Sequence, residues 1–400
     1  MALARGTLNQ DGSTKPRVAI VSYPWVSMAP YKFLSDLLQI LEPIAERIVL
    51  IDGNTERITT GSDKVELRDI GTSMHAAADV RPAFYSKLLW IAKCLKAQFR
   101  ASIELVSIRE DIDVVLFYVA YPFYVIPLLT AKLLKKKAIE VVTRSVSGTE
   151  NDYTKFWIFK RQEQLMFALL DGISPESKGV FDVLELDKYE RKILPEGARF
   201  VDTSRFRVCT KFADRDLVAG YIGRLVRQKG ITELVDAIPL IAKKKRVGFL
   251  IGGSGALLDE VREKCERVST EEKVSITVPG WIPEQDLPRN LNKLRLFVLP
   301  TRQSEGIPTA VLEAMACGTP VLAPPVGAIP DVITDGLTGF LIEEHSPSGI
   351  AHDVIRALEH PHLEEIAHNA RQLVELRFTK EAAIERYAAM LDQTLRGRKT

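Results

Sequence analysis

The chain has few cysteines and histidines and almost no excess of charge of either sign. Its 400 residues include four cysteines and six histidines, with no Cys-x-x-Cys pair and no histidine near a cysteine at metal-ligand spacing. A disulfide framework and a structural zinc site are therefore not expected, and a reducing cytoplasm fits this cysteine usage. Lys and Arg total 54 against 52 Asp and Glu, a formal net charge of +2. A nucleic-acid binder normally carries a larger basic excess, so we expect no nucleic-acid partner.

Long apolar runs are also scarce. Residues 1–16 lack the apolar core of a signal peptide, so we expect a flexible tail and no secretory leader. One stretch, Val114 to Ala131, runs without a charge for roughly the length of a membrane span and is followed by KLLKKK. Pro122 and Pro127 interrupt it, and its first residues, VVLFYV, are β-branched and aromatic. We predict a buried strand, a turn and a short helix here, with a membrane span as the alternative.

What the sequence does contain is a regular alternation of strands and helices. With 46% hydrophobic and 26% charged residues, it has the composition of a globular protein of roughly two or three domains. Apolar runs of strand length alternate with amphipathic helical stretches, which requires parallel sheets covered on both faces. The fold class predicted is α/β, with two doubly wound Rossmann-like domains that face each other across a cleft. The expected strands are 17–23, 47–53, 113–119, 138–144, 217–225, 246–253, 274–280, 294–300 and 320–324.

The boundary between the two domains is predicted where the charged segment TSRFRVCTKFADRD interrupts the apolar pattern. The amino-terminal domain then covers residues 17–205, and the carboxy-terminal domain covers residues 206–378. Residues 379–400 are expected to form a helix that crosses back to the amino-terminal domain. Ligands of open α/β sheets bind beyond the carboxyl ends of the strands, so we expect the ligand between the two domains.

The segment SEGIPTAVLEAMACGTPVL, residues 304–322, is the most informative. It follows a predicted strand, and its helix starts near Thr309, so the backbone N–H groups of Ile307, Thr309 and Ala310 offer an anion site. Glu305 precedes this helix and Glu313 lies one turn inside it. Carboxylates flanking an anion site suit a ligand with central phosphates and hydroxyls at both ends, such as a nucleotide sugar. The alternative is a capped helix with solvated glutamates.

A second segment, GRLVRQKG, directly follows the strand predicted over residues 217–225. Arg224 and Lys229 leave the carboxyl end of that strand, where a guanidinium and an ammonium can hold a diphosphate. A basic solvated turn is the other interpretation of the same residues.

Taken together, these segments resemble retaining glycosyltransferases of family 4, which have the GT-B fold. The resemblance rests on GRLVRQKG, GGSG at 252–255, VPGW at 278–281 and the Glu-x7-Glu pair, and it covers about residues 217–342. It implies catalytic roles for Glu305, Arg224 and Lys229, with the two basic residues on the donor diphosphate. It also implies that Glu305 contacts the sugar hydroxyls and Glu313 the ribose hydroxyls. Further implied donor contacts are Ile282 along the base and the backbone of Gly306, Ile307, Pro308 and Thr309.

The first half departs from the pattern of that family. The turn after the first strand, SYPWVS, lacks the Gly-Gly found in many members, and many members also carry a histidine near the reacting sugar. His75 is the only histidine before residue 345, and it falls in an expected loop, so no catalytic histidine is assigned. Arg144 or Ser145 is expected to occupy that region instead.

Two further patterns carry weaker expectations. The Asp-x-Asp sequences at 111–113 and 214–216 are interpreted as solvated turns, and no metal site is expected. In the helix predicted over residues 86–100, Leu88, Ile91, Ala92, Leu95 and Phe99 share one face, flanked by Lys93, Lys96 and Arg100. We expect an ordinary helix packed on the sheet, with docking on an anionic membrane as the alternative.

The resemblance therefore implies a retaining enzyme that moves a sugar from a UDP- or GDP-linked donor to a hydroxyl, with no cofactor or metal. The expected acceptor is a lipid-linked or cell-surface glycan, and the expected location is cytoplasmic or on the cytoplasmic face of a membrane. A non-catalytic nucleotide-sugar-binding subunit is the alternative, and a dinucleotide-dependent oxidoreductase is a more distant one.

Overall fold

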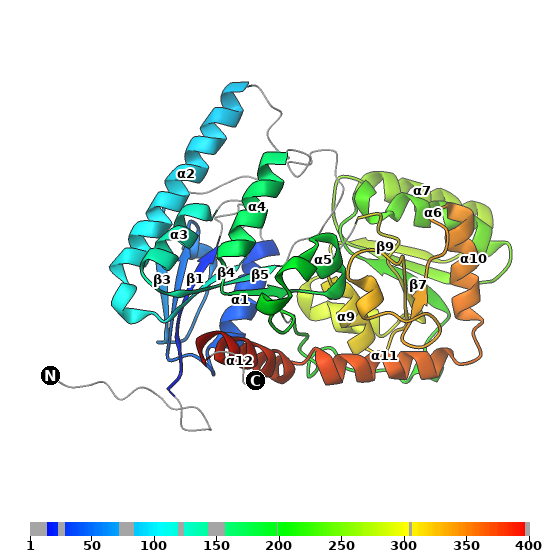
Figure 1. The fold of residues 1–400 in the computed structure, drawn as a ribbon. Helices are drawn as coiled ribbons and strands as arrows, with labels where there is room; N and C mark the ends of the chain where they lie inside the picture. Colours follow the sequence, from blue (N-terminus) through cyan, green and yellow to red (C-terminus); the bar gives the residue numbers. More distant parts are fainter. Residues whose placement is uncertain are drawn as a thin grey trace.

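The computed structural model describes residues 14–22, 29–71, 84–118, 124–142, 157–197, 199–303 and 306–396. They form two domains, each built on a six-stranded parallel sheet with helices on both faces (Figure 1). The predicted α/β architecture with two doubly wound domains is confirmed.

The sheet of the amino-terminal domain has the order β3-β2-β1-β4-β5-β6. Four of its strands were predicted, whereas β3 and β6 were not. β3 is a half-exposed edge strand without an apolar run, and β6 has only four residues. The strands are β1 (Arg17–Ser22), β2 (Arg47–Asp52), β3 (Val65–Asp69), β4 (Val114–Tyr118), β5 (Lys137–Val142) and β6 (Gly172–Pro175).

Successive residues of β1 point to opposite faces of this sheet and enter different apolar clusters. Ala19 and Val21 pack against the helices on one face, whereas Val18 and Ile20 pack against the helices on the other. Because both faces are covered, the strands read as nearly continuous apolar runs. One face carries α2 (Phe84–Ser107), α3 (Val125–Leu133) and α4 (Trp157–Leu169), and the other carries α1 (Ala29–Leu41).

The uncharged stretch from Val114 to Ala131 forms β4 and most of α3, as predicted; the turn expected between them falls on residues 119–123, outside the described residues. Across the described ranges, no helix has both the length and the apolar character needed to cross a bilayer.

Helix α2 packs on the sheet, but not with the face that the sequence suggested. Its buried side consists of small and polar residues together with Leu105, and it includes Cys94, Ala97 and Ala101. The predicted apolar face points to solvent instead, since Leu95 is 44% and Phe99 is 56% exposed.

The carboxy-terminal sheet has the order β12-β11-β10-β7-β8-β9, again with every pair parallel. Five of its strands were predicted, and only the two-residue edge strand β12 was not. Its strands are β7 (Val218–Ile222), β8 (Gly248–Gly252), β9 (Ile276–Gly280), β10 (Leu296–Val298), β11 (Val321–Ala323) and β12 (Phe340–Leu341). Its helices are α6 (Ile231–Ala242), α7 (Leu258–Glu272), α8 (Leu287–Leu291), α9 (Thr309–Ala316), α10 (Pro347–Leu358) and α11 (Leu363–Arg377).

The connection between the domains is anchored rather than solvated. Val201 and Phe206 are buried in the core of the carboxy-terminal domain. Arg215 is also buried, and its guanidinium donates to the carbonyls of Leu294 (3.1 Å) and Cys317 (2.7 Å). A charged segment can therefore be structural when backbone carbonyls accept its hydrogen bonds.

Helix α12 (Lys380–Arg396) returns to the amino-terminal domain after α11 (Figure 1). Its residues Ala383, Tyr387 and Met390 are buried in the same apolar cluster as Val18 and Ile20 of β1. The two domains are thus joined by two crossings of the chain.

Candidate active site

Four loops meet at the carboxyl edge of the carboxy-terminal sheet, where they follow β7, β8, β9 and β10. Backbone hydrogen bonds tie them together: Leu225 N–H to Ser254 O (2.8 Å), Gly253 N–H to Gly280 O (2.7 Å) and Arg302 N–H to Gln228 O (2.9 Å). Segments far apart in the sequence therefore become one surface, and this surface contains the predicted donor-site residues.

Arg224 and Lys229 both lie in the loop after β7. The hydroxyl of Tyr221 donates to the Arg224 carbonyl (2.6 Å) and fixes the start of the turn. The Arg224 side chain is exposed and forms no ion pair or hydrogen bond within the described ranges, whereas Lys229 is half-buried. An exposed guanidinium without an acidic neighbour is available to an anionic ligand.

The end of this loop requires a glycine. Gly230 has φ +69°, and a Cβ there would overlap the backbone carbonyl of Pro300. Because only glycine adopts this conformation without cost, the chain can turn into α6 while touching the end of β10. This contact sets the position of Lys229 beside the loop that leads to α9.

Ile282 lies just after β9 and is buried. Its Cδ1 packs against Gly252, where an added Cβ would overlap it. The GGSG turn thus leaves room for this side chain, and Ile282 forms part of the apolar floor next to the four loops.

The start of α9 has the features of an anion site. Gly306 and Ile307 are buried, Pro308 is the N-cap residue with extended backbone, and Thr309 is the first helical residue. In the described part of the chain, the backbone N–H groups of Ile307, Thr309 and Ala310 have no acceptor. Free N–H groups and the helix dipole favour a phosphate here. Glu305, the predicted sugar-binding residue, lies outside the described residues.

Glu313 lies one turn into α9 and is buried, with 7% of the residue exposed. Burial raises the pKa of this carboxyl to about 7, although Lys32 and Arg205 oppose the shift. The Nζ of Lys32 lies 3.7 Å from Glu313 Oε1 and 3.8 Å from Glu284 Oε1. Since Lys32 belongs to α1, a lysine of one domain meets two carboxylates of the other.

Arg205 completes this charge cluster, because its Nη1 donates to Glu284 Oε1 at 3.0 Å. Sequence analysis missed Lys32, Arg205 and Glu284, which are far apart in sequence and belong to no motif. The one available signal was that α1 follows the carboxyl end of β1, where ligands of such sheets bind.

A second group of polar residues lies in the amino-terminal domain, opposite the loop that leads to α9. Glu176, directly after β6, is buried and paired with Arg199, whose guanidinium lies over the Phe33 ring at 4.1 Å. Burial raises the pKa of Glu176, and the charge of Arg199 opposes that shift. Asp36 of α1 interacts electrostatically with Arg199, but burial still raises the pKa of its carboxyl to about 6. None of these residues was predicted.

Other predicted features fall elsewhere. His75, Arg144, Ser145 and the SYPWVS turn lie largely or wholly outside the described residues. In the first Asp-x-Asp sequence, Asp113 pairs with Arg17 (2.7 Å) and Asp111 pairs with Arg47 (3.3 Å). In the second, both aspartates are exposed. Neither sequence gathers carboxylates around a common point.

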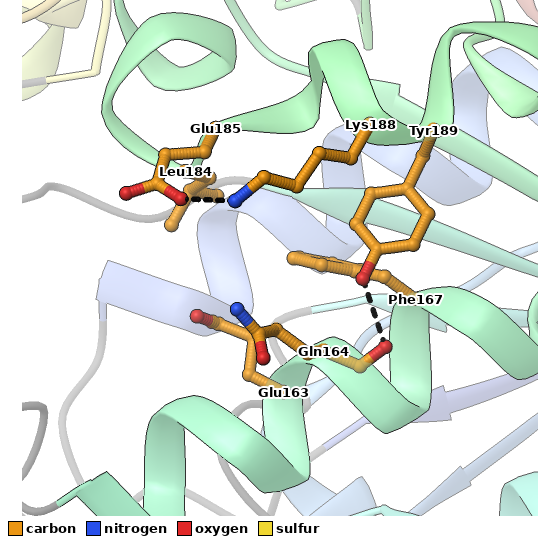
Figure 2. Close-up of a pocket in the computed structure, with 7 residues that line it drawn as sticks. All are labelled: Glu163, Gln164, Phe167, Leu184, Glu185, Lys188 and Tyr189. Carbon is orange, nitrogen blue, oxygen red and sulfur yellow. Dashed lines mark hydrogen bonds and ion pairs between the residues drawn. The ribbon is translucent and has the colours of Figure 1, made fainter.

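A separate pocket lies on the amino-terminal domain between α4 and the helical turn Leu186–Lys192 (Figure 2). The hydroxyl of Tyr189 donates to the carbonyl of Gln164 (3.0 Å) along one side of it, and Lys188 pairs with Glu185. The lining residues are Glu163, Gln164, Phe167, Leu184, Glu185, Lys188 and Tyr189. No predicted site residue is among them, so the candidate site is the junction of the two domains.

Several known proteins are similar to this chain. Residues 216–360 match the family model for glycosyl transferases group 1. The capsular polysaccharide biosynthesis glycosyltransferase CapM of Staphylococcus aureus is 29% identical over 188 residues, which are 46% of this chain and 48% of that protein. The N-acetyl-alpha-D-glucosaminyl L-malate synthase of Bacillus anthracis is 22% identical across 73% of this chain and 77% of that enzyme.

Among solved structures, Anabaena HepE in complex with UDP superposes with a TM-score of 0.68 at 15% identity, over 94% of this chain and 100% of that chain. The fold is therefore GT-B, as the resemblance implied. The chain is homologous to glycosyltransferases, although it spans about half the length of CapM and of two other curated relatives that it matches.

Proposed function

We propose that this protein is a retaining glycosyltransferase of family 4 that moves a sugar from a nucleoside-diphosphate sugar to a hydroxyl acceptor. The observation that carries the proposal is the start of α9. There, N–H groups without an acceptor among the described residues, the exposed Arg224 and the buried Glu313 lie on one surface at the junction of two domains. A diphosphate with a ribose on one side and a sugar on the other fits this order of groups.

In the proposed reaction, the bond between the sugar C1 and the diphosphate oxygen breaks while a new bond forms from C1 to the acceptor oxygen. The acceptor hydroxyl approaches from the face that the diphosphate leaves, so the configuration at C1 is retained. Its proton passes to the departing phosphate oxygen, and the nucleoside diphosphate leaves with the electron pair of the broken bond. Arg224, Lys229 and the N–H groups of α9 stabilise the negative charge on the leaving group. We therefore expect these positive groups to stabilise the leaving group without a metal or other cofactor.

The two glutamates have different proposed roles. Glu313 holds the ribose hydroxyls, for which a buried carboxylate at the edge of an anion site is well placed. Glu305 orients the transferred sugar and stabilises the positive charge that develops on its ring. Closure of the two domains over the donor keeps water from the reacting carbon.

The donor we propose is UDP-linked, with GDP-linked sugars as the alternative. HepE was solved with UDP, and the relative CapM acts in capsular polysaccharide biosynthesis, which supports a nucleotide-sugar donor and a glycan or lipid-linked acceptor. The proposed location is the cytoplasm or the cytoplasmic face of a membrane, reached through the exposed apolar face of α2.

Thermal unfolding in the presence of UDP, GDP, ADP and NAD tests this proposal first. A ligand at 100 times its dissociation constant adds about 2.7 kcal/mol to the free energy of unfolding. We expect one nucleoside diphosphate to raise the Tm, and its sugar conjugate to be consumed when a suitable acceptor is present. A shift with NAD alone would instead indicate a dinucleotide-dependent enzyme.

A non-catalytic nucleotide-sugar-binding subunit is the rival proposal, since the first half lacks the Gly-Gly turn and the histidine of many family members. Binding of the nucleotide sugar without turnover, across a panel of glycan, lipid-linked and simple alcohol acceptors, would favour that alternative. Release of the nucleoside diphosphate that requires an acceptor would exclude it.

A further inference from the structure

One carboxylate oxygen of Glu176 has no hydrogen-bond partner among the described residues. The side chain is 1% exposed, and one oxygen, Oε1, pairs with Nε of Arg199. The other oxygen, Oε2, is fully buried and accepts no hydrogen bond within the part of the chain that the structure describes. An unsatisfied buried carboxylate oxygen is costly, so its presence calls for a physical reason.

The orphaned oxygen faces the donor loop of the opposite domain. A Cβ built on Gly306 would lie 2.7 Å from Glu176 Oε2 and 3.2 Å from its Cδ. A side chain at residue 306 would displace this carboxylate, so the close approach of Glu176 favours glycine there.

The carboxylate is held in this position from behind. Arg199 pairs with Oε1 and rests on the ring of Phe33, and the guanidinium is itself largely buried. The pairing fixes the plane of the carboxylate and offsets its negative charge. A neutralised carboxylate can approach a diphosphate sugar without strong repulsion, and Oε2 keeps its capacity to accept a hydrogen bond.

We propose that Glu176 Oε2 accepts a hydrogen bond from a hydroxyl of the transferred sugar, which makes Glu176 a substrate-positioning residue supplied by the amino-terminal domain. Gly306 lies next to Glu305 in the loop assigned to the donor sugar, so a group against Gly306 faces the sugar rather than the base. Because Oε2 is enclosed in the present arrangement, the domains part to admit the sugar and close with the carboxylate over it. The inference rests on the proposed function and adds a contact that specifies a free hydroxyl on the sugar.

The test compares the affinities of UDP and UDP-glucose in the wild type and in Glu176→Gln, measured by calorimetry. Glu176→Gln is expected to leave the UDP affinity within about twofold and to weaken UDP-glucose by about 10-fold or more, as for loss of a hydrogen bond to a charged group. Glu185→Gln is the matched control, since Glu185 is an exposed carboxylate of the same domain that pairs with Lys188. This control should bind both ligands as the wild type does.

If Glu176→Gln weakens UDP and UDP-glucose equally, Glu176 has only a structural role and the inference is wrong. If Glu176→Gln binds both ligands as tightly as the wild type does, the inference is wrong as well. Should Glu176→Gln fold poorly, the double variant Glu176→Gln/Arg199→Gln keeps a neutral hydrogen-bonding pair in the same space, and the same ratio decides. If UDP does not bind, the measurement is made with GDP and GDP-mannose. Failure of the wild type to bind any nucleoside diphosphate overturns the proposed function itself.

Deoxy analogues of UDP-glucose identify the hydroxyl. In the wild type, removal of the hydroxyl that contacts Glu176 should weaken binding about as much as Glu176→Gln does. In the variant, the same removal should have almost no further effect, because the interaction is already lost. Additive losses for every hydroxyl would contradict a direct contact.

Discussion

Lys32 of α1 and Glu313 of α9 face each other across the junction of the two domains, with 3.7 Å between Nζ and Oε1. The lysine side chain is 48% exposed, whereas that of the glutamate is 10% exposed. The amino-terminal domain thus places a cation at the carboxylate to which we assign the ribose. Nucleotide binding would exchange this long ion pair for hydrogen bonds from ribose hydroxyls.

The buried position of Glu313 predicts a pH dependence of stability. Burial raises its pKa to about 7, against 4.5 for an ordinary glutamate, so the folded state binds the proton more tightly than the unfolded state. The resulting stability is fully present below pH 4.5 and is lost as the pH rises to about 7, by on the order of 3 kcal/mol. Urea unfolding between pH 4.5 and 8 should show this loss in the wild type, and Glu313→Gln should remove it.

Other groups contribute to the pH profile, so the difference between the two proteins is the informative quantity. Burial also raises the pKa values of Asp36 and Asp52 to about 6. Their contributions persist in Glu313→Gln and cancel in the difference. Glu381→Gln, an exposed change on α12, should parallel the wild type. A difference between the wild type and Glu313→Gln that is constant with pH would contradict the assigned pKa.

Arg224 is predicted to bind the donor diphosphate without contributing to the stability of the fold. Its side chain is exposed and unpaired within the described ranges, so Arg224→Ala should leave the Tm of the free protein nearly unchanged. The same variant should weaken binding of the nucleoside diphosphate by about 10- to 100-fold, the usual effect of losing a charge-assisted contact. Thermal unfolding measures the Tm, and calorimetric titration measures the affinity for the nucleoside diphosphate.

Arg227 provides the control for this experiment, because it is an exposed arginine of the same loop with no ion pair in the described part of the chain. If Arg227→Ala weakens nucleotide binding as much as Arg224→Ala does, the effect is one of general positive charge and not of a specific contact.

Much of the fold follows from local pattern, because strands buried on both faces read as apolar runs. Strands β3, β6 and β12 were missed since they are short or lie at an edge, where packing decides more than composition. The loops to which we assign the donor could be located for a similar reason: each follows a strand, and their motifs are contiguous in sequence.

The other half of the site depends on contacts between domains, which no local pattern encodes. Lys32 and Glu176 acquire their importance only when the two sheets face each other, and Gly306 is explained by the carboxylate opposite it. The orientation of α2 was also wrong in the sequence analysis. Its small residues pack on the sheet, and the larger apolar ones point outward.

Glu305 is predicted to act in transfer rather than in nucleotide binding. Glu305→Ala should bind the nucleoside diphosphate with nearly wild-type affinity and lose transfer activity, because it removes contacts to the sugar alone. Glu313→Ala should instead weaken the binding of the nucleoside diphosphate itself. Parallel measurement of nucleotide affinity and acceptor-dependent turnover separates the two residues. Full activity in Glu305→Ala would show that the Glu-x7-Glu pair is assigned wrongly.

The exposed face of α2 predicts association with an anionic membrane. Leu95, Phe99 and Ile103 are 44, 56 and 65% exposed and lie at helical spacing. Lys93 and Lys96 are exposed beside them and form no ion pair within the described ranges. An apolar stripe flanked by lysines suits the surface of a bilayer that contains acidic lipids.

Flotation with vesicles of phosphatidylglycerol and phosphatidylcholine tests this association against pure phosphatidylcholine. We expect the wild type to bind the anionic vesicles, and Phe99→Ser/Ile103→Ser or Lys93→Ser/Lys96→Ser to reduce the bound fraction several-fold. Arg100 is left unchanged, since it donates to the Ile70 carbonyl (2.6 Å) and is structural. Leu376→Ser is the control, because Leu376 is 76% exposed on α11 of the other domain. Equal binding by the wild type and both α2 variants would exclude α2 as the membrane-binding surface.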